Sequence, residues 1–240
     1  MTVPHEAPEA PGPAAAAVGA TVDLEVDVTG PLPGAAAALH KACDVAEDGG
    51  PGTVLTLWLS AGAAGVADWP GDTGIHDVNR WERAVRRLEG TRAATVAVAA
   101  GATGGPALDL LLAADHRIAD RTLRLSLPGH GGLLWPGMSA HRLAHQLGVA
   151  RARRLVLTDA AIPAGHALDL ALVDEVVDDT RAAVKAAVAR LSGVPGSELA
   201  LRRRLLAEAV TTGYEEALGS HLAACDRELR RIRGTSEVRA

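Results

Sequence analysis

A short apolar run that passes through a glycine-rich turn into an apolar helix limits the fold of this chain more than any other stretch. The run is Val96–Ala100 and the helix-like segment is Pro106–Ala114. Three glycines lie in the turn between them: Gly101, Gly104 and Gly105. The first N–H groups of a helix have no intrahelical partner, so Gly105 and its neighbours suit an anion or a developing oxyanion. Pro106 fits the first helical turn, but it removes one of those donors.

Strand-like and helix-like segments alternate ahead of this turn. Thr21–Thr29 alternates apolar and acidic residues as a half-exposed strand does, whereas Thr53–Leu59 is almost entirely apolar, as a fully buried strand is. Helices are predicted at Ala35–Glu47 and at Asp77–Glu89, and the second has one apolar face. This alternation predicts a largely parallel sheet with right-handed crossovers.

The second half of the chain begins with a short strand at Leu123–Leu127 and a glycine-rich loop at Pro128–Gly137. Helices and one more apolar strand follow, at 138–147, 150–157, 164–170 (helices) and 173–177 (strand). Beyond Asp178 the pattern is helical only, with apolar stripes that one subunit is too small to bury. We therefore expect a leader at 1–20, a core at 21–178 and a helical layer at 179–240 that is used in oligomerisation.

Composition excludes several classes of function. The chain has 24 Lys and Arg against 29 Asp and Glu, a net charge of −5, with no block of like charges, so nucleic-acid and membrane-surface binding are not expected. Cys43 and Cys225 lie far apart and without metal-ligand spacing, which predicts a reduced cytoplasmic protein with no metal. The first twenty residues start with acids and prolines, which is typical of a disordered leader and not of a signal peptide.

The order of motifs from Val96 to Asp179 resembles that of the enoyl-CoA hydratase/isomerase, or crotonase, superfamily. In this chain it reads VAVAAGATGGPALDLLLAADHRIA, then LSLPGHGGLLWPGMSAHRLAHQLGVARARRLVLTDAAIPAGHALDLALVDEVVDD. More narrowly, the WERAVRRLE helix, the GG-x-ALD turn, WPGM and the HLAACDRELRR tail are similar to the small hydratase-like B component of dihydroxyphenylglycine pathways.

The resemblance implies an α/β fold, a crotonase-type spiral of ββα units whose C-terminal helices complete a homotrimer or hexamer. It implies a CoA thioester as substrate or ligand, and no cofactor. The implied partners are a type III polyketide synthase, which makes 3,5-dihydroxyphenylacetyl-CoA from malonyl-CoA, and a sister hydratase-like protein. The chain would then assist dehydration and aromatisation of the CoA-bound intermediate, in the biosynthesis of a non-proteinogenic amino acid for glycopeptide-type antibiotics.

The resemblance also assigns a site. Hydratases of the family use two backbone N–H groups to stabilise an enolate-like thioester oxygen and two glutamates to transfer protons. The first glutamate falls on Asp109, and the second falls on Gly129, which has no side chain. The second backbone donor falls on Pro106, and losing one such donor costs about 3 kcal/mol. We place the first donor at Pro70 or Gly71.

Four of these residues have both a functional and a structural interpretation. Asp109 could be a general base or acid if burial raises its pKa, or a carboxylate held ionised by the start of its helix. His130 could replace the lost glutamate, or it could be a solvated loop residue. Trp69 and Trp135 flank the predicted pocket loops, where they could cover an acyl chain or anchor the core.

Three further sets of residues are also compared for a functional and a structural interpretation. His141 and His145 have the i, i+4 spacing of metal ligands but no evident third ligand, so we expect them to be solvated. The arginines at 202–204 could contact CoA phosphates or form an ordinary basic helix face. Asp115 and Arg117 are expected to pair with each other at the end of the central helix.

Three functions remain open. The chain is an accessory enzyme acting on the product of the synthase, a non-catalytic crotonase-fold activator of that synthase, or an ordinary enoyl-CoA hydratase. The glycine at 129 disfavours the third, because a two-carboxylate hydration needs a second acid. The sequence does not choose between the first two.

Overall fold

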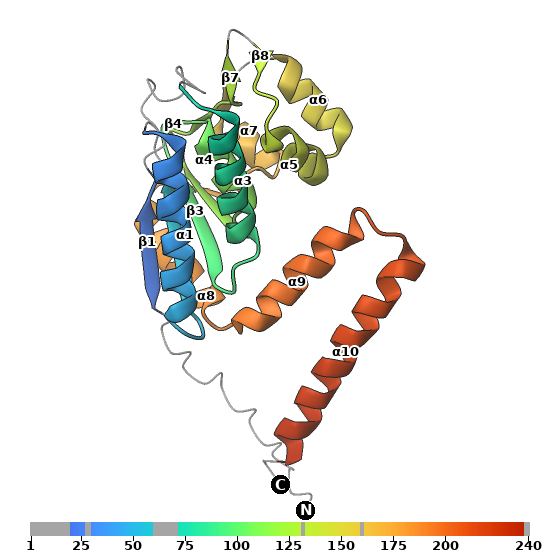
Figure 1. Ribbon diagram of the computed structural model, residues 1–240. Coiled ribbons are helices and arrows are strands. Elements are labelled where there is room, and N and C mark those ends of the chain that lie inside the picture. Colours follow the sequence, from blue (N-terminus) through green and yellow to red (C-terminus); the bar gives the residue numbers. More distant parts are fainter. Residues whose placement is uncertain (1–19, 27–29, 60–71, 131–132, 159–160, 238–240) are drawn as a thin grey trace, which may run out of the picture.

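The computed structural model describes residues 20–26, 30–59, 72–130, 133–158 and 161–237 (Figure 1). Its centre is a parallel sheet with the strand order β1-β2-β3-β5-β10. The strands are β1 (Thr21–Glu25), β2 (Val54–Leu59), β3 (Ala94–Ala99), β5 (His116–Asp120) and β10 (Glu175–Val177). Every residue of β3 is buried, as expected of a central strand covered on both faces. The predicted parallel α/β fold is therefore confirmed.

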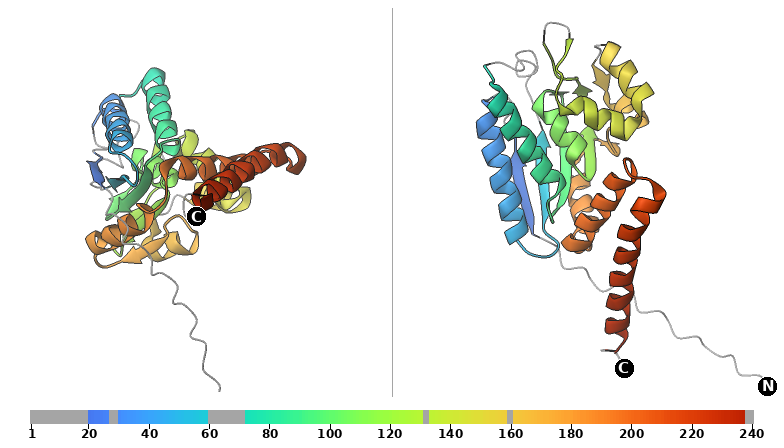
Figure 2. Two further views of the ribbon diagram at one scale, coloured as in Figure 1. Left: turned by 90° about the horizontal axis from the view of Figure 1, so that it is seen from below. Right: turned by 45° about the vertical axis from the view of Figure 1, so that its right-hand side comes forward.

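Helices α1 (Leu32–Asp48) and α3 (Ile75–Glu89) lie side by side on one face of the sheet (Figures 1 and 2). The buried residues of α3 recur at helical spacing: Trp81, Ala84, Val85 and Leu88. They join the larger hydrophobic core beneath β2 and β3. The opposite face is covered by α8 (Thr180–Leu191), whose Val184, Ala187 and Val188 pack on a second apolar cluster.

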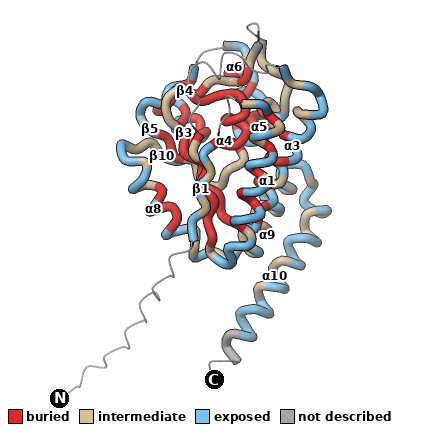
Figure 3. Tube along the Cα trace, turned by 60° about the vertical axis from the view of Figure 1, so that its left-hand side comes forward, coloured by how far each residue is buried: buried red, intermediate tan, exposed pale blue. Residues whose placement is uncertain are grey.

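The predicted strand, turn and helix at the centre of the chain are present. After β3 the chain forms the short strand β4 (Ala102–Thr103) and then α4 (Pro106–Ala113), which is buried along nearly its whole length. The path through the turn needs a left-handed backbone at Gly101 (φ 58°) and Gly105 (φ 57°), which glycine adopts without strain. Figure 3 shows α4 in the buried interior of the molecule.

The short strands that follow α4 differ from the sequence-based expectation in two places. The strand predicted at 123–127 is limited to β6 (Arg124–Leu125), which pairs with β4 and with β9 (Ile162–Pro163). The predicted loop at 128–137 contains a small hairpin, β7 (Gly129–His130) and β8 (Leu133–Leu134). The helices α5 (Met138–Leu147), α6 (Val149–Thr158) and α7 (Ala164–Asp169) lie where the sequence predicts them.

The C-terminal segment is helical, as predicted, but α8 packs on the sheet and only the last two helices leave the body. These are α9 (Gly196–Ala209), which has no buried residue, and α10 (Tyr214–Glu237) (Figures 2 and 3). An ion pair between Arg227 and Glu198 at 2.8 Å joins them. The division at residue 178 and the role in oligomerisation stay predictions, and residues 1–19 lie outside the described part.

Candidate functional site

The turn between β3 and α4 presents the start of a buried helix. Gly105 precedes the helix, and Pro106 is its first residue, so that position supplies no N–H. Ala107 and Leu108 direct their N–H groups to the carbonyl oxygens of Gly104 and Gly105, each at 3.2 Å. These backbone hydrogen bonds fix the conformation of the turn.

Asp109 lies one turn into α4 and is 5% exposed. Its carboxylate accepts three hydrogen bonds: from Trp81 Nε1 at 3.0 Å, from Ser139 Oγ at 2.7 Å and from Arg142 Nη1 at 3.0 Å. The donors come from α3 and α5, which flank α4 on its way from the turn. Asp109 is thus a buried carboxylate whose oxygens are both engaged by protein donors.

Arg142 is the centre of this polar cluster. Besides Asp109, its guanidinium contacts Glu82 at 3.0 Å and Glu89 at 2.9 Å, both on α3. One buried cation therefore serves three carboxylates on two helices. Because buried charge is costly unless it is paired and hydrogen-bonded, the cluster fixes the relative position of α3, α4 and α5.

Burial raises the pKa of the Asp109 carboxyl, and the adjacent Arg142 guanidinium with the Trp81 and Ser139 donors opposes that shift. Burial and the nearby charge of Asp109 also raise the pKa of Glu82, again against the pull of Arg142. Two carboxyl groups with raised pKa values beside one arginine are the kind of arrangement found at sites of proton transfer. A buried ion cluster with a purely structural role raises the pKa values of its carboxyl groups in the same way.

The other residues that the sequence assigned to the site are only partly brought together. Gly129 begins β7 and pairs with Leu134 in the hairpin. Trp135 follows the hairpin. Its backbone N–H donates to the Pro128 carbonyl oxygen at 2.7 Å, and its half-buried ring packs against the core. His130 is in β7, but its side chain, like Trp69, Pro70 and Gly71, lies outside the described residues.

The sequence did not identify Trp81, Ser139 and Arg142 as donors to Asp109, nor Glu82 as a partner of Arg142. A signal was present in α5, whose buried positions recur at i, i+3, i+4 and i+8 but begin with two polar residues, Ser139 and Arg142. A polar residue at a buried helical position needs a partner. Nothing in the sequence says that the partner is Asp109.

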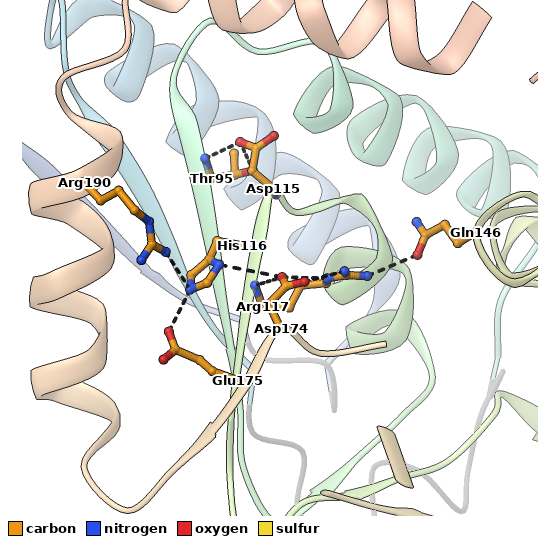
Figure 4. Close-up of polar contacts among 8 residues, drawn as sticks. All are labelled: Thr95, Asp115, His116, Arg117, Gln146, Asp174, Glu175 and Arg190. Atoms are coloured by element: carbon orange, nitrogen blue, oxygen red, sulfur yellow. Dashed lines mark hydrogen bonds and ion pairs between the residues drawn. The ribbon is translucent and has the colours of Figure 1, made fainter. Parts of the chain in front are cut away.

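A second polar network lies at the beginning of β5 (Figure 4). The expected pair of Asp115 with Arg117 is wrong. Asp115 accepts hydrogen bonds from the Thr95 N–H at 2.8 Å and from its hydroxyl at 2.9 Å, whereas Arg117 pairs with Asp174 at 2.8 Å. His116 lies between them, with its Nε2 2.7 Å from Glu175. Asp115 lies just ahead of β5, where its carboxylate meets Thr95 of β3, whereas Arg117 lies within β5 and its guanidinium meets Asp174, just ahead of β10.

His141 and His145 are exposed on α5 with ring centroids 4.1 Å apart. Among the residues that the structure describes, no three His, Cys, Asp or Glu side chains are placed to hold a metal ion together. No helix of the described segments is long and apolar enough to cross a membrane.

The chain is similar to known proteins along most of its length. Residues 78–237 match the family described as enoyl-CoA hydratase/isomerase. A protein of Amycolatopsis orientalis named enoyl-CoA-hydratase is 44% identical over 212 residues, which cover 87% of this chain and 95% of that protein. The motifs that carry the resemblance in the sequence lie within the matched residues.

Solved structures agree in fold. A Pseudomonas aeruginosa protein is 26% identical, with a TM-score of 0.69 over 85% of this chain and 94% of the other. An enoyl-CoA hydratase from Mycobacterium smegmatis is 18% identical, with a TM-score of 0.71 over 86% of each chain. At that identity the second likeness concerns the fold alone.

Proposed function

The chain belongs to the enoyl-CoA hydratase/isomerase family, and we propose that it is a hydratase-like accessory protein that acts beside a type III polyketide synthase. In this proposal it binds a CoA thioester and assists dehydration and aromatisation on the way from malonyl-CoA to 3,5-dihydroxyphenylacetyl-CoA. The support for the synthase as partner is the similarity of the WERAVRRLE helix, WPGM and the HLAACDRELRR tail to the B component of dihydroxyphenylglycine pathways.

One observation favours an accessory role over an independent hydratase: the carboxylate that matches the first proton-transferring glutamate is already engaged. Asp109 accepts hydrogen bonds from Trp81, Ser139 and Arg142. The matching position for the second glutamate is Gly129, which has no side chain. The two matching positions therefore hold one carboxyl group, already hydrogen-bonded, where such a hydration uses two.

The turn at Gly105 is where we propose that the thioester carbonyl binds. Pro106 supplies no N–H, so oxyanion stabilisation would depend on the remaining donor of this turn and on one from Gly71, because the alternative placement at Pro70 has no N–H either. The catalytic role of Asp109 stays a prediction. To act as a base on a bound thioester, Asp109 would use Oδ2, which accepts from Trp81 only, while Oδ1 stays held by Ser139 and Arg142.

A second candidate function is a non-catalytic activator that keeps the fold as a scaffold for the synthase. The burial of Asp109 and its three hydrogen bonds favour it, because a 5% exposed aspartate held by three protein donors serves the packing of α3, α4 and α5 without any substrate. Both candidates require the synthase, and they differ in what happens when Asp109 is changed.

The proposal is tested by reconstituting the synthase from malonyl-CoA with and without this protein, and with the sister hydratase-like protein added. Free 3,5-dihydroxyphenylacetate and its thioester are quantified. We expect the thioester or the free acid to rise when this protein is present. An unchanged product yield contradicts the proposal.

Hydration of crotonyl-CoA by the protein alone is the control for the third function. We expect it to be negligible, because the second carboxylate and one backbone donor are absent. A kcat of order 10 to 10³ per second, typical of an active hydratase, would show an ordinary hydratase instead.

A further inference from the structure

A cleft of about 440 Å³ opens between α1 and α3, away from Asp109 and its donors. It is lined by His40 on α1 and by four residues of α3: His76, Asn79, Arg80 and Arg83. Each of these side chains is able to donate hydrogen bonds, and none is acidic.

The four residues of α3 form one stripe. Positions 76, 79, 80 and 83 have the spacing i, i+3, i+4 and i+7, so their side chains project from one face of the helix. The stripe faces α1, as Arg87, one turn further along, shows by its contacts with that helix. His40 completes the cleft from the α1 side.

The two ends of the α1–α3 contact differ in charge. At the C-terminal end, Arg87 is neutralised by Asp44 at 2.8 Å and by Glu47 at 2.9 Å. At the N-terminal end α1 is made of Leu, Pro, Gly and Ala up to Leu39, so it offers no carboxylate to the cleft. Among the residues that the structure describes, the lining of the cleft therefore includes two arginines and no carboxylate.

Arg80 and Arg83 are both exposed, and neither has an ion pair or a side-chain hydrogen bond to any residue within 20–26, 30–59, 72–130, 133–158 and 161–237. Two unpaired guanidinium groups one turn apart repel each other. This repulsion makes the arrangement unfavourable on its own, and an anion between the two groups would remove it.

We propose that the cleft of His40, Asn79, Arg80 and Arg83 binds a phosphate group. A guanidinium presents a planar fork of donors that matches phosphate oxygens in pairs, and an imidazole and an amide add single donors. A cleft of about 440 Å³ has room for a phosphate group together with a neighbouring group of the same molecule, such as the second phosphate of a pyrophosphate. The phosphate comes either from the nucleotide end of CoA or from free phosphate, and the site does not depend on the synthase.

The test uses the full chain in calorimetric titrations with pyrophosphate, CoA and dephospho-CoA. The variant Arg80→Gln/Arg83→Gln removes both guanidinium groups, and we expect its binding to be at least about tenfold weaker. Arg80→Lys/Arg83→Lys keeps the charge but not the fork, so its affinity should be intermediate.

The matched control is Arg151→Gln/Arg154→Gln on α6, which removes two exposed arginines that also lack a partner among the described residues. Its affinity should stay within about twofold of the original, because neither arginine lines the cleft between α1 and α3. The loss of two charges is the same in both variants, so nonspecific attraction of anions is controlled.

The ligands separate the two sources of phosphate. Weakened binding of CoA and not of dephospho-CoA assigns the cleft to the 3′-phosphate, and weakened binding of pyrophosphate alone assigns it to free phosphate. Either result supports the proposal. Equal weakening in both glutamine variants, unweakened binding in Arg80→Gln/Arg83→Gln, or no binding of any of the three ligands by the original protein overturns it.

Discussion

Arg203 on α9 donates to the carboxylate of Asp115, 88 residues earlier in the chain, just ahead of β5. The same guanidinium donates to the carbonyl oxygens of Thr91 and Ala93, the second at 2.9 Å. The sequence allows Arg203 as a ligand of CoA phosphates, but its guanidinium N–H groups donate to Asp115, Thr91 and Ala93 instead. It ties a helix without buried residues to the core.

Arg203→Met should loosen α9 and α10 from the body. The change leaves Asp115 part-buried without its cation, and breaking such a pair costs about 3 kcal/mol. We expect a lower free energy of unfolding in urea and faster proteolysis between α8 and α9. Arg202→Met, at an exposed position of the same helix, is the control, and equal effects of the two changes would contradict the prediction.

Arg142→Met should be the more damaging substitution. It leaves Asp109 buried with no cation beside it, and Glu82 and Glu89 lose the same partner. We expect a loss of about 3–5 kcal/mol in the free energy of unfolding at pH 7. Part of the loss should be recovered as the pH falls toward 5, because protonation removes the unpaired charges.

The control for that substitution is Arg86→Met. Arg86 is on α3, and its ion pair with Glu89 is exposed, with the arginine side chain 81% accessible. An exposed pair is worth at most about 1 kcal/mol. A loss for Arg142→Met no larger than this would show that the buried cluster does not hold α3, α4 and α5 together.

Asp109→Asn separates catalyst from scaffold. The change keeps the shape of the side chain and removes the base. If Asp109 transfers a proton, stimulation of the synthase should fall about a hundredfold or more. If the protein is a scaffold, stimulation should stay within about a factor of two. The measurement is product yield in the reconstituted synthase reaction, alongside an unfolding curve that shows the variant is folded.

Glu47 should make the free energy of unfolding depend on pH in the acidic range. Hydrogen bonds from Arg87, together with the Arg92 N–H and the Thr91 hydroxyl, lower its pKa from 4.5 to about 2. A carboxyl with a lowered folded-state pKa stabilises the fold above its unfolded pKa, and that contribution is lost as the pH falls from about 4.5 toward 2. Glu47→Gln should cost about 1–2 kcal/mol at pH 7, allowing for solvent screening.

The pH dependence is checked by urea unfolding of the original protein and of Glu47→Gln between pH 7 and pH 2. The difference between the two should shrink as the pH falls through this window. A constant difference would mean that the ionised carboxylate is not what stabilises the contact of α1 with the loop before β3.

The oligomeric state is the last prediction. Large apolar side chains are exposed on α9 and α10, among them Leu206 (72%), Leu222 (57%) and Leu229 (50%). Their burial between subunits would remove apolar surface from water. We expect a trimer or a hexamer by light scattering at micromolar concentration. A monomer, or an unchanged mass after Leu222→Glu/Leu229→Glu, would contradict the role of these helices.

Local sequence was enough to predict the central strand, turn and helix. Val96–Ala100 has no polar residue, three glycines follow, and Pro106 suits only the first turn of a helix, so each local preference agrees with the fold. The strand β5 was missed. Its sequence, HRIAD, has three polar residues in five, and its stability comes from pairing with β3 and with β10, which is 57 residues later in register.

The sequence by itself determined that a carboxylate at 109 lies in the first turn of a buried helix and that position 129 offers no second one. Only the tertiary structure decided which groups that carboxylate contacts, because its donors, Trp81 and Arg142, are on other helices, 28 and 33 residues away. A buried charge must find partners, but periodicity specifies only which face of a helix is buried. Which polar groups meet on those faces depends on how α3, α4 and α5 pack, and that is a property of the whole fold.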